Sequence, residues 1–233
     1  GGPVRNLVTG ESYALTGGGA WTGGPSGYIL DCNANDRGAL GAAHANLKQA
    51  KLVTILWQGS ISATPTDNAF FAGVTYNAAI TNPYIGYSLA IPQPQVGAQY
   101  KLDFNTDGAY QAVTATSAIG FNGTVRQVVG TIKNGTQVIW ENGQPLPTTG
   151  GTKGYTNLTY ASDSTFGVGA AAAGLTRNSK SFADTVLIWN RILSQQEIAS
   201  LYSDPFQIYR KKSWFMTVAQ AVTNTGRFFH FFN

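Results

Sequence analysis

The chain has 233 residues, of which only 11% are charged, and its formal net charge is +4. Its basic residues form a single cluster, at 210–212. A nucleic-acid-binding surface needs many more clustered lysines and arginines, so we expect no nucleic-acid partner. We also expect no membrane span, because no apolar run approaches the ~20 residues that cross a bilayer. Cys32 is the single cysteine, which excludes an intrachain disulfide.

Apolar residues recur at every second position between turn signals, a pattern typical of short β-strands. In the first half of the chain we expect strands at residues 28–30, 52–58, 69–76 and 84–91. Segment 52–58 is apolar almost throughout, which favours a central strand buried on both faces. The glycines at 17–19 and 23–24 are expected in loops.

Three dipeptides typical of tight hairpin turns follow: Asp107-Gly108, Asn134-Gly135 and Asn142-Gly143. Both central positions of a type I′ turn need positive φ, which Asp, Asn and Gly tolerate. The strands that these turns join are predicted at 100–104, 109–114, 125–133 and 136–141.

Two further strands and one helix are expected near the end of the chain. The strands are predicted at 165–168 and 182–189. Ser194 with Glu197 forms a capping-box pattern at the start of the helix, and Pro205 ends it. Its apolar face would carry Ile198, Leu201 and Tyr202.

Strand 182–189 is apolar on both faces, as expected inside a two-layer sandwich. Alternation would turn one set of side chains to one face: Phe182, Val186 and Ile188. The opposite face would carry Leu187 and Trp189. The helix that follows would then cover an open end of the sandwich.

Segment 182–202 closely resembles the closing segment of concanavalin A-like, laminin G-like domains, with Asn190-Arg191 before a Leu-Ser pair and the short helix. Segments 53–57 and 138–143 resemble an early core strand and an Asn-Gly hairpin of that family. The resemblance implies an all-β fold, a two-sheet antiparallel jelly-roll sandwich with one short C-terminal helix. It places a domain at residues 1–205 and an aromatic tail at 206–233. Domains of this type occur in extracellular, bacterial-surface and phage virion proteins, so we expect an extracellular or virion location.

Acidic residues are too few for the glycosidase chemistry that some relatives perform. Glycoside hydrolases use two carboxylates that flank the scissile bond, and the resembling hydrolases carry Glu-x-Asp-x-x-Glu on one strand. No acidic residue lies two positions from any of the three glutamates, which are Glu11, Glu141 and Glu197. The two histidines, His44 and His230, lack metal-ligand spacing. Cys32 with His44 could form a nucleophile pair, but a buried inert thiol is the preferred interpretation. We therefore expect that the protein is not an enzyme.

One segment resembles a calcium loop. Asp103, Asn105 and Asp107, followed by Gly108, match the first half of an oxygen-ligand loop, but its twelfth position is Thr114 instead of glutamate. A plain hairpin turn is the alternative interpretation. Many laminin G-like domains bind calcium at the sandwich rim, so the resemblance keeps calcium as a candidate cofactor, with Asp36 and Asp163 as further ligands.

Sugar recognition needs aromatic platforms beside amide or carboxylate groups, because the CH faces of sugars stack on rings. The candidate ligand-binding residues combine loop aromatics with amides: Trp21, Tyr76, Asn77, Tyr84, Tyr155 and Asn157. Rings that only cover loop edges are the alternative. By contrast, Trp57, Trp140 and Trp189 are expected in the core.

The tail at 206–233 is strongly apolar, so it either packs back on the domain or meets another chain. The candidate assembly residues are aromatic: Trp214, Phe228, Phe229, Phe231 and Phe232. Two functions follow from the sequence. The first is a carbohydrate-binding or adhesion module whose partner is a glycan. The second is a structural virion protein, a capsid-decorating or tail component, assembled as a homo-oligomer or with other virion or surface chains.

Overall fold

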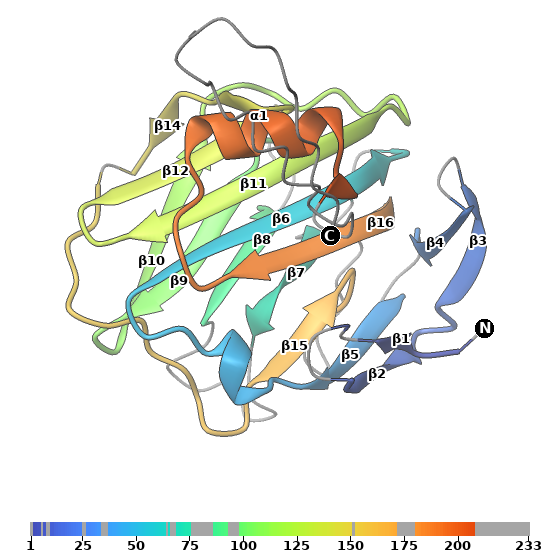
Figure 1. Cartoon of the computed structure of the whole chain (residues 1–233), viewed down its shortest axis with the longest axis horizontal. Helices are drawn as coiled ribbons and strands as arrows, with labels where there is room; N and C mark the ends of the chain where they lie inside the picture. The colour runs from blue at the N-terminus through green and yellow to red at the C-terminus, as the bar shows by residue number, and fades with distance from the viewer. Residues whose placement is uncertain are drawn as a thin grey trace, which may run out of the picture.

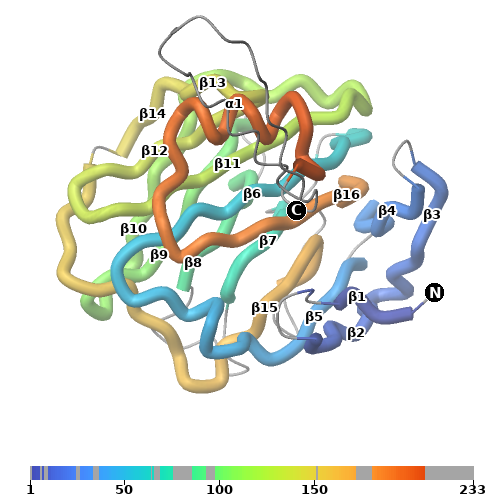
Figure 2. Tube along the Cα trace, in the orientation of Figure 1, coloured from blue at the N-terminus to red at the C-terminus, as the bar shows by residue number. Residues whose placement is uncertain are grey.

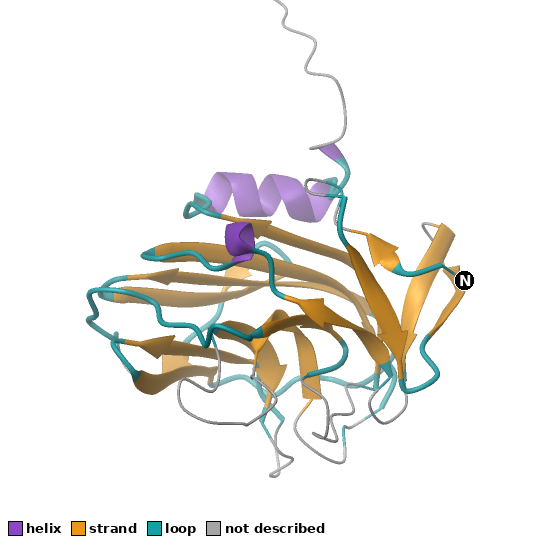
Figure 3. Ribbon diagram, turned by 90° about the horizontal axis from the view of Figure 1, so that it is seen from below, coloured by secondary structure: helices purple, strands orange, loops and turns teal. Residues whose placement is uncertain are grey.

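The computed structural model describes residues 2–5, 7, 10–24, 27–33, 37–63, 65, 69–75, 86–92, 98–150, 152–171 and 180–207. These residues form two antiparallel sheets stacked face to face, with one α-helix on the outside (Figures 1 and 3). The predicted all-β sandwich with one short C-terminal helix is thus confirmed. Within the described part of the chain, no helix has the length and apolar character needed to cross a membrane.

The nine-stranded sheet holds, in spatial order, β1 (Val4–Arg5), β2 (Ser12–Thr16), β5 (Gly38–Ala42), β15 (Thr165–Val168), β7 (Ala69–Thr75), β8 (Tyr87–Ile91), β9 (Lys101–Thr106), β10 (Ala109–Ala115) and β14 (Thr148–Thr149). The seven-stranded sheet holds β13 (Gln144–Pro145), β12 (Thr136–Glu141), β11 (Val125–Lys133), β6 (Leu52–Ile61), β16 (Ser181–Trp189), β4 (Gly27–Cys32) and β3 (Ala20–Gly24). Strand β6 is the middle strand of its sheet, as the apolar run at 52–58 predicts. Its neighbour β16 comes more than a hundred residues later in the chain (Figure 2).

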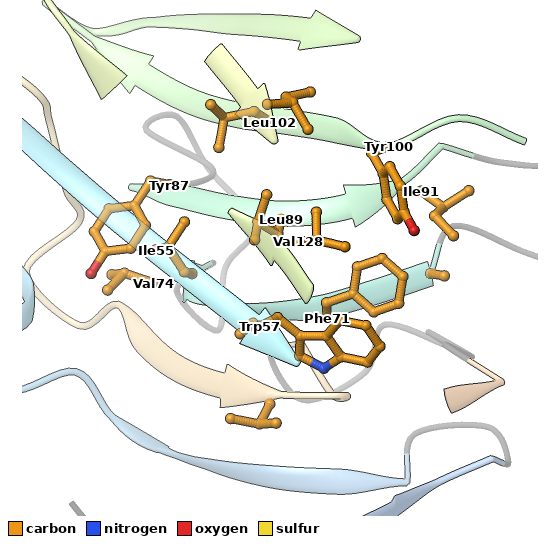
Figure 4. Close-up of a cluster of buried hydrophobic side chains, with 14 of the residues drawn as sticks. Ile55, Trp57, Phe71, Val74, Tyr87, Leu89, Ile91, Tyr100, Leu102 and Val128 are labelled. Atoms are coloured by element: carbon orange, nitrogen blue, oxygen red, sulfur yellow. The ribbon is translucent and has the colours of Figure 1, made fainter. Parts of the chain in front are cut away.

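Aromatic side chains from both sheets meet in the core (Figure 4). Trp57 of β6 packs on Phe71 of β7 with ring centroids 4.5 Å apart, and Tyr100 lies 6.3 Å beyond Phe71. All three side chains are almost completely buried. Burial of one such side chain stabilises the fold by roughly 1.5–3 kcal/mol, so this contact across the interface holds the layers together.

The sequence suggested that the C-terminal helix covers an open end of the sandwich, and this prediction is wrong for α1 (Gln195–Ser203). The helix lies across the outer face of the seven-stranded sheet (Figure 1). Ile198 and Leu201 pack there against Leu56 and Val129, which alternation turns outward from the core. These outward apolar residues need a cover, and α1 provides it. The predicted capping box is confirmed: Ser194 accepts from the amide of Glu197, and the Glu197 carboxylate accepts from the amide of Ser194.

A β-bulge in β16 corrects the predicted faces of this strand. The register with β6 shifts between Ala183 and Thr185. Because one extra residue reverses the alternation, Ala183 and not Phe182 joins the core with Val186 and Ile188. After the bulge the prediction is confirmed, since Leu187 and Trp189 turn to the helix side.

The three hairpin turns do not all have the predicted backbone. Asp107-Gly108 and Asn142-Gly143 have positive φ at both positions, as type I′ turns require. At the remaining turn only Gly135 has positive φ. The carboxamide Oδ1 of Asn134 instead accepts a hydrogen bond of 2.9 Å from the amide of Tyr155.

Short N-terminal strands were missed by the sequence prediction. Gly23 and Gly24 lie in strand β3 and not in a loop, where they pair with Tyr28 and Gly27 of β4. Glycines and small residues hide the alternating pattern on which a strand prediction depends. The missed strands β1, β2, β3 and β5 form one side of the molecule, next to the site described below (Figure 1).

Candidate functional site

Strand β16 loses one of its two neighbours after its first three residues. Residues Ser181–Ala183 pair with β4 on one side and with β6 on the other. Beyond the bulge, residues 185–189 pair with β6 alone. Among the described residues, no strand takes the other edge of this segment. The backbone N–H and C=O groups of alternate residues in such a segment face outward, ready to bind a ligand or another strand.

A cavity of about 1130 Å³ runs beside this open edge. Every residue from Asp184 to Asn190 contributes to its lining. Core side chains from both sheets form its apolar wall: Tyr13, Leu30, Phe166, Val168, Val186 and Ile188. The cavity exceeds the ~300–1,000 Å³ that is usual for small-molecule sites, so it has room for an extended ligand.

Trp21 lies at the Asp184 end of the cavity. Strand pairing fixes this position, because Ala183 pairs with Leu30 of β4 and Leu30 pairs with Trp21 of β3. The indole Nε1 donates a hydrogen bond of 2.6 Å to the carbonyl of Gly2, which holds the ring in one orientation. The half-buried ring therefore packs on the core while part of it stays accessible from the cavity.

Amide side chains lie at the opposite end of the cavity. Trp189 pairs with Thr54 near the start of β6, and the 3-10 turn Ala45–Leu47 precedes β6 in the chain. Asn46 of this turn and Asn190, just after β16, are both exposed and line the cavity. The ring nitrogen Nδ1 of His44 accepts from the backbone amide of Asn46, which caps the turn and leaves the Asn46 carboxamide outside this contact.

Two charged groups complete the lining. Arg5 of β1 is exposed, and Asp184 lies in the β16 bulge. The carboxylate Oδ2 of Asp184 accepts a hydrogen bond of 3.4 Å from Nε2 of Gln58. The cavity thus offers an indole, carboxamides, a guanidinium and a carboxylate around an apolar wall, and these groups can both stack on and hydrogen-bond to a polar ligand.

Of the three predicted ligand-binding residues that the structure describes, only Trp21 lines this cavity. The expectation for Tyr155 is corrected: its ring is buried, and its hydroxyl donates a 2.6 Å hydrogen bond to the carbonyl of Lys51. Burial raises the pKa of Tyr155 to about 12. Asn157 is exposed, but its backbone belongs to the Asp107 turn. The other three candidates lie outside the described residues: Tyr76, Asn77 and Tyr84.

The predicted calcium ligands have protein partners. Asp103 is buried, pairs with Nζ of Lys101 at 3.0 Å and accepts from the hydroxyl of Tyr110. Oδ1 of the buried Asn105 accepts from the hydroxyl of Thr159 at 2.9 Å.

The third predicted ligand, Asp107, is exposed and accepts from the amides of Thr156 and Asn157 at 2.8 and 3.0 Å. Among the described residues, no three His, Cys, Asp or Glu side chains are grouped to hold a metal ion. Asp163 lies in an exposed turn, and Asp36 lies outside the described residues. Calcium binding stays a prediction.

A partly buried polar cluster that the sequence did not reveal joins the two sheets near Tyr100. The Tyr100 hydroxyl donates to Oε1 of Glu141 at 2.8 Å, and Nη1 of Arg126 donates to the same oxygen at 2.5 Å. Burial, with the Glu141 carboxylate beside it, holds the pKa of Tyr100 well above its usual value. A phenol that is harder to ionise is a poor nucleophile, and the lining of the cavity includes none of the three residues. We interpret the cluster as structural.

The thiol of Cys32 is buried, as the sequence analysis predicts. Cys32 has no exposed surface, and burial raises its pKa to about 12. A thiol held in its neutral form is a weak nucleophile, so the interpretation of Cys32 as an inert core residue agrees with its surroundings.

No protein-family model and no curated protein matches the sequence. Solved structures do share the fold. A sialidase from Trypanosoma rangeli in complex with sialic acid superposes with a TM-score of 0.61 at 16% identity, over 89% of this chain and 32% of the sialidase chain. Domain 4 of AbnA, a GH43 extracellular arabinanase from Geobacillus stearothermophilus, was solved in complex with arabinotriose. It superposes with a TM-score of 0.56 at 13% identity, over 86% of both chains.

These similarities establish the β-sandwich fold, and they correct one prediction from the sequence. We expected that the protein is not an enzyme, yet the solved structures that share its fold include sialidases, which are enzymes. The chain spans about a third of the length of the sialidase that it matches. The small number of acidic residues in this chain was therefore not enough to exclude an enzyme, because this fold also occurs as one part of larger glycan-processing proteins.

Proposed function

We propose that the chain is a carbohydrate-binding β-sandwich module whose ligand lies in the cavity beside β16. The observation that carries the proposal is the position of Trp21 at one end of this cavity, with polar groups around the apolar wall. The CH faces of a sugar stack on an indole, while its hydroxyl groups bond to carboxamides, carboxylates and guanidinium groups. The arabinotriose bound to AbnA domain 4, which shares this fold, supports the same ligand class.

The finer assignments from the sequence form part of this proposal. The closing segment 182–202 supports a laminin G-like domain, and an extracellular or virion location agrees with a glycan ligand. An adhesion role follows if the glycan belongs to a cell surface. Sialidases and an arabinanase share the fold, so the proposal covers a module that acts as part of a glycan-processing protein.

A glycan array followed by calorimetry on the purified chain tests the proposal. We expect Trp21→Ala to weaken binding of the selected glycan at least tenfold, because a lost stacking contact of ~1.4 kcal/mol corresponds to that factor. The matched control is Tyr28→Ala on the adjacent strand β4. Tyr28 is 79% exposed and does not line the cavity, so its loss leaves binding unchanged.

Two results would contradict this proposal. One is a chain that binds no glycan on the array, and the other is equal loss of affinity in the Trp21 and Tyr28 variants. Trp21→Phe keeps an aromatic ring against the core. It therefore shows whether Trp21→Ala loses binding only because that variant unfolds. Assaying the same samples for released sugar shows whether the chain also processes the glycan that it binds.

A further inference from the structure

The groups suited to sugar recognition are separated along the length of β16. Trp21 lies at the end where Ala183 pairs with Leu30, and Asn190 lies just beyond the opposite end of the strand. From Asp184 to Asn190 the chain advances about 20 Å at ~3.3 Å per residue. A single sugar ring is far shorter than this, so it contacts one end or the other but not both.

The open edge of β16 fills the space between these two ends. Residues 185–189 have no strand partner on this side within the described residues, and all of them line the cavity. An open strand edge presents N–H donors and C=O acceptors in regular alternation. A sugar hydroxyl is both donor and acceptor, so a linear glycan can meet both kinds of group as it follows the strand.

We infer that the ligand is a linear oligosaccharide lying along β16, with one end stacked on Trp21 and the other end bonded to Asn46 and Asn190. This inference rests on the proposed function and adds the length and shape of the ligand. Backbone groups supply the middle contacts, so the site selects an extended chain over a branched or single sugar. The apolar wall accommodates the CH faces of the rings.

An extended peptide also pairs with an open strand edge. The groups at the two ends favour a glycan, because an exposed arginine, two exposed asparagines and an indole suit hydroxyl-rich rings better than a second apolar strand. Strand addition is therefore kept as an outcome of the experiment.

The experiment is a length series. Oligosaccharides of increasing length, prepared from the polysaccharide that the glycan array selects, are titrated calorimetrically into the full chain. We expect affinity to rise with each unit until the ligand spans the cavity, and then to level off. Trp21→Phe weakens binding of short and long ligands alike. We expect short ligands to bind at the Trp21 end, where the stacking contact lies. The double variant Asn46→Ala/Asn190→Ala therefore leaves the shortest ligands unaffected and weakens the long ones at least tenfold.

Hydrogen exchange adds a second measurement, which would not change with ligand length if the cavity residues had only a structural role. Long ligands should slow amide exchange within residues 185–189, whereas a monosaccharide should not. Tyr28→Ala is the control in both measurements, since Tyr28 lies on β4 away from the cavity lining.

The outcomes separate the inference from the proposed function. If a monosaccharide binds as tightly as the longest ligand, or if the asparagine variant behaves alike at every length, the inference is wrong while carbohydrate binding stands. If no glycan binds at all, both are wrong. Protection of residues 185–189 by an unrelated extended peptide, without protection by any glycan, would assign the edge to strand addition.

Discussion

The Tyr100 hydroxyl donates a 2.8 Å hydrogen bond to the Glu141 carboxylate across the sandwich interior. Tyr100 immediately precedes β9 of the nine-stranded sheet, and Glu141 ends β12 of the seven-stranded sheet. Arg126 of β11 bonds the same carboxylate and also donates to the carbonyl of Gly120 at 2.9 Å. One carboxylate therefore joins both layers, and without it the buried Tyr100 and the partly buried Arg126 would both lose this partner.

Glu141→Gln is expected to lower the free energy of unfolding by about 2–3 kcal/mol, because the partly buried Arg126 loses its countercharge. Tyr100→Phe removes only the hydroxyl and should cost about 1 kcal/mol. Urea denaturation of the two variants and the parent measures both values. Equal costs would contradict the interpretation of Arg126–Glu141 as the dominant pair.

The capping box should contribute measurably to the docking of α1. Ser194→Ala removes the acceptor for the Glu197 amide and is expected to cost about 1 kcal/mol. Gln196→Ala is the matched control, because Gln196 is exposed in the same turn and alanine suits a helix at least as well. Thermal unfolding followed by circular dichroism tests this, and a larger loss in the control would refute it.

The charge on Glu197 should make stability depend on pH. Hydrogen bonds from Arg191, with further ones from Ser194, lower the pKa of Glu197 to about 2 from 4.5. The folded state therefore favours the charged form, so the contribution is complete above pH 4.5 and is lost as pH falls toward 2.

This contribution should be small, about 0.5 kcal/mol, because both side chains of the Arg191–Glu197 pair are largely exposed. Unfolding curves measured across this pH window should fall less steeply for Glu197→Gln than for the parent. Parallel curves would show that the ion pair adds nothing in solution.

Gly59 of β6 pairs with Ala183 of β16 and has no room for a side chain. A Cβ at this position would lie 2.1 Å from the Phe182 carbonyl oxygen and 2.6 Å from the Trp57 ring. Gly59→Ala is therefore expected to destabilise the fold by about 2 kcal/mol or more, through overpacking next to the bulge. Gly23→Ala on β3 meets nothing within 4 Å and should change the unfolding midpoint little. A neutral Gly59 variant would mean that the two strands can separate at little cost.

Strands with clear apolar alternation and turn residues at their ends could be predicted, whereas several short N-terminal strands beside the cavity could not. The bounds of β11, β12 and β15 agree with the sequence prediction residue for residue, because apolar alternation and turn residues define their ends. Strands β3 and β5 were missed because glycines and small residues carry no such pattern, and β1 was missed because its two residues are too few to show one. The bulge at Asp184 was also missed, since one inserted residue leaves no mark in composition.

The candidate site was predictable only in part. Trp21 was recognised as an aromatic outside the expected strands, and it lies at the cavity. Asn46, Asn190 and the open edge of β16 were missed, because they come together only through strand pairing between distant segments. Tyr155 was misjudged because its burial depends on contacts with Lys51 and Phe104, which are remote in sequence.

The aromatic tail gives the last prediction. The proposed assembly residues lie outside the described residues: Trp214, Phe228, Phe229, Phe231 and Phe232. The tail sequence is strongly apolar, and apolar residues of this kind often serve an interface between chains. We therefore expect the full chain to form concentration-dependent oligomers in analytical ultracentrifugation and a chain truncated after Gln207 to remain monomeric. Lys211→Ala/Lys212→Ala is the control, because it removes charge and keeps the aromatics. If truncation instead lowers the melting temperature without changing the molecular mass, the tail packs on its own domain and assembly needs another surface.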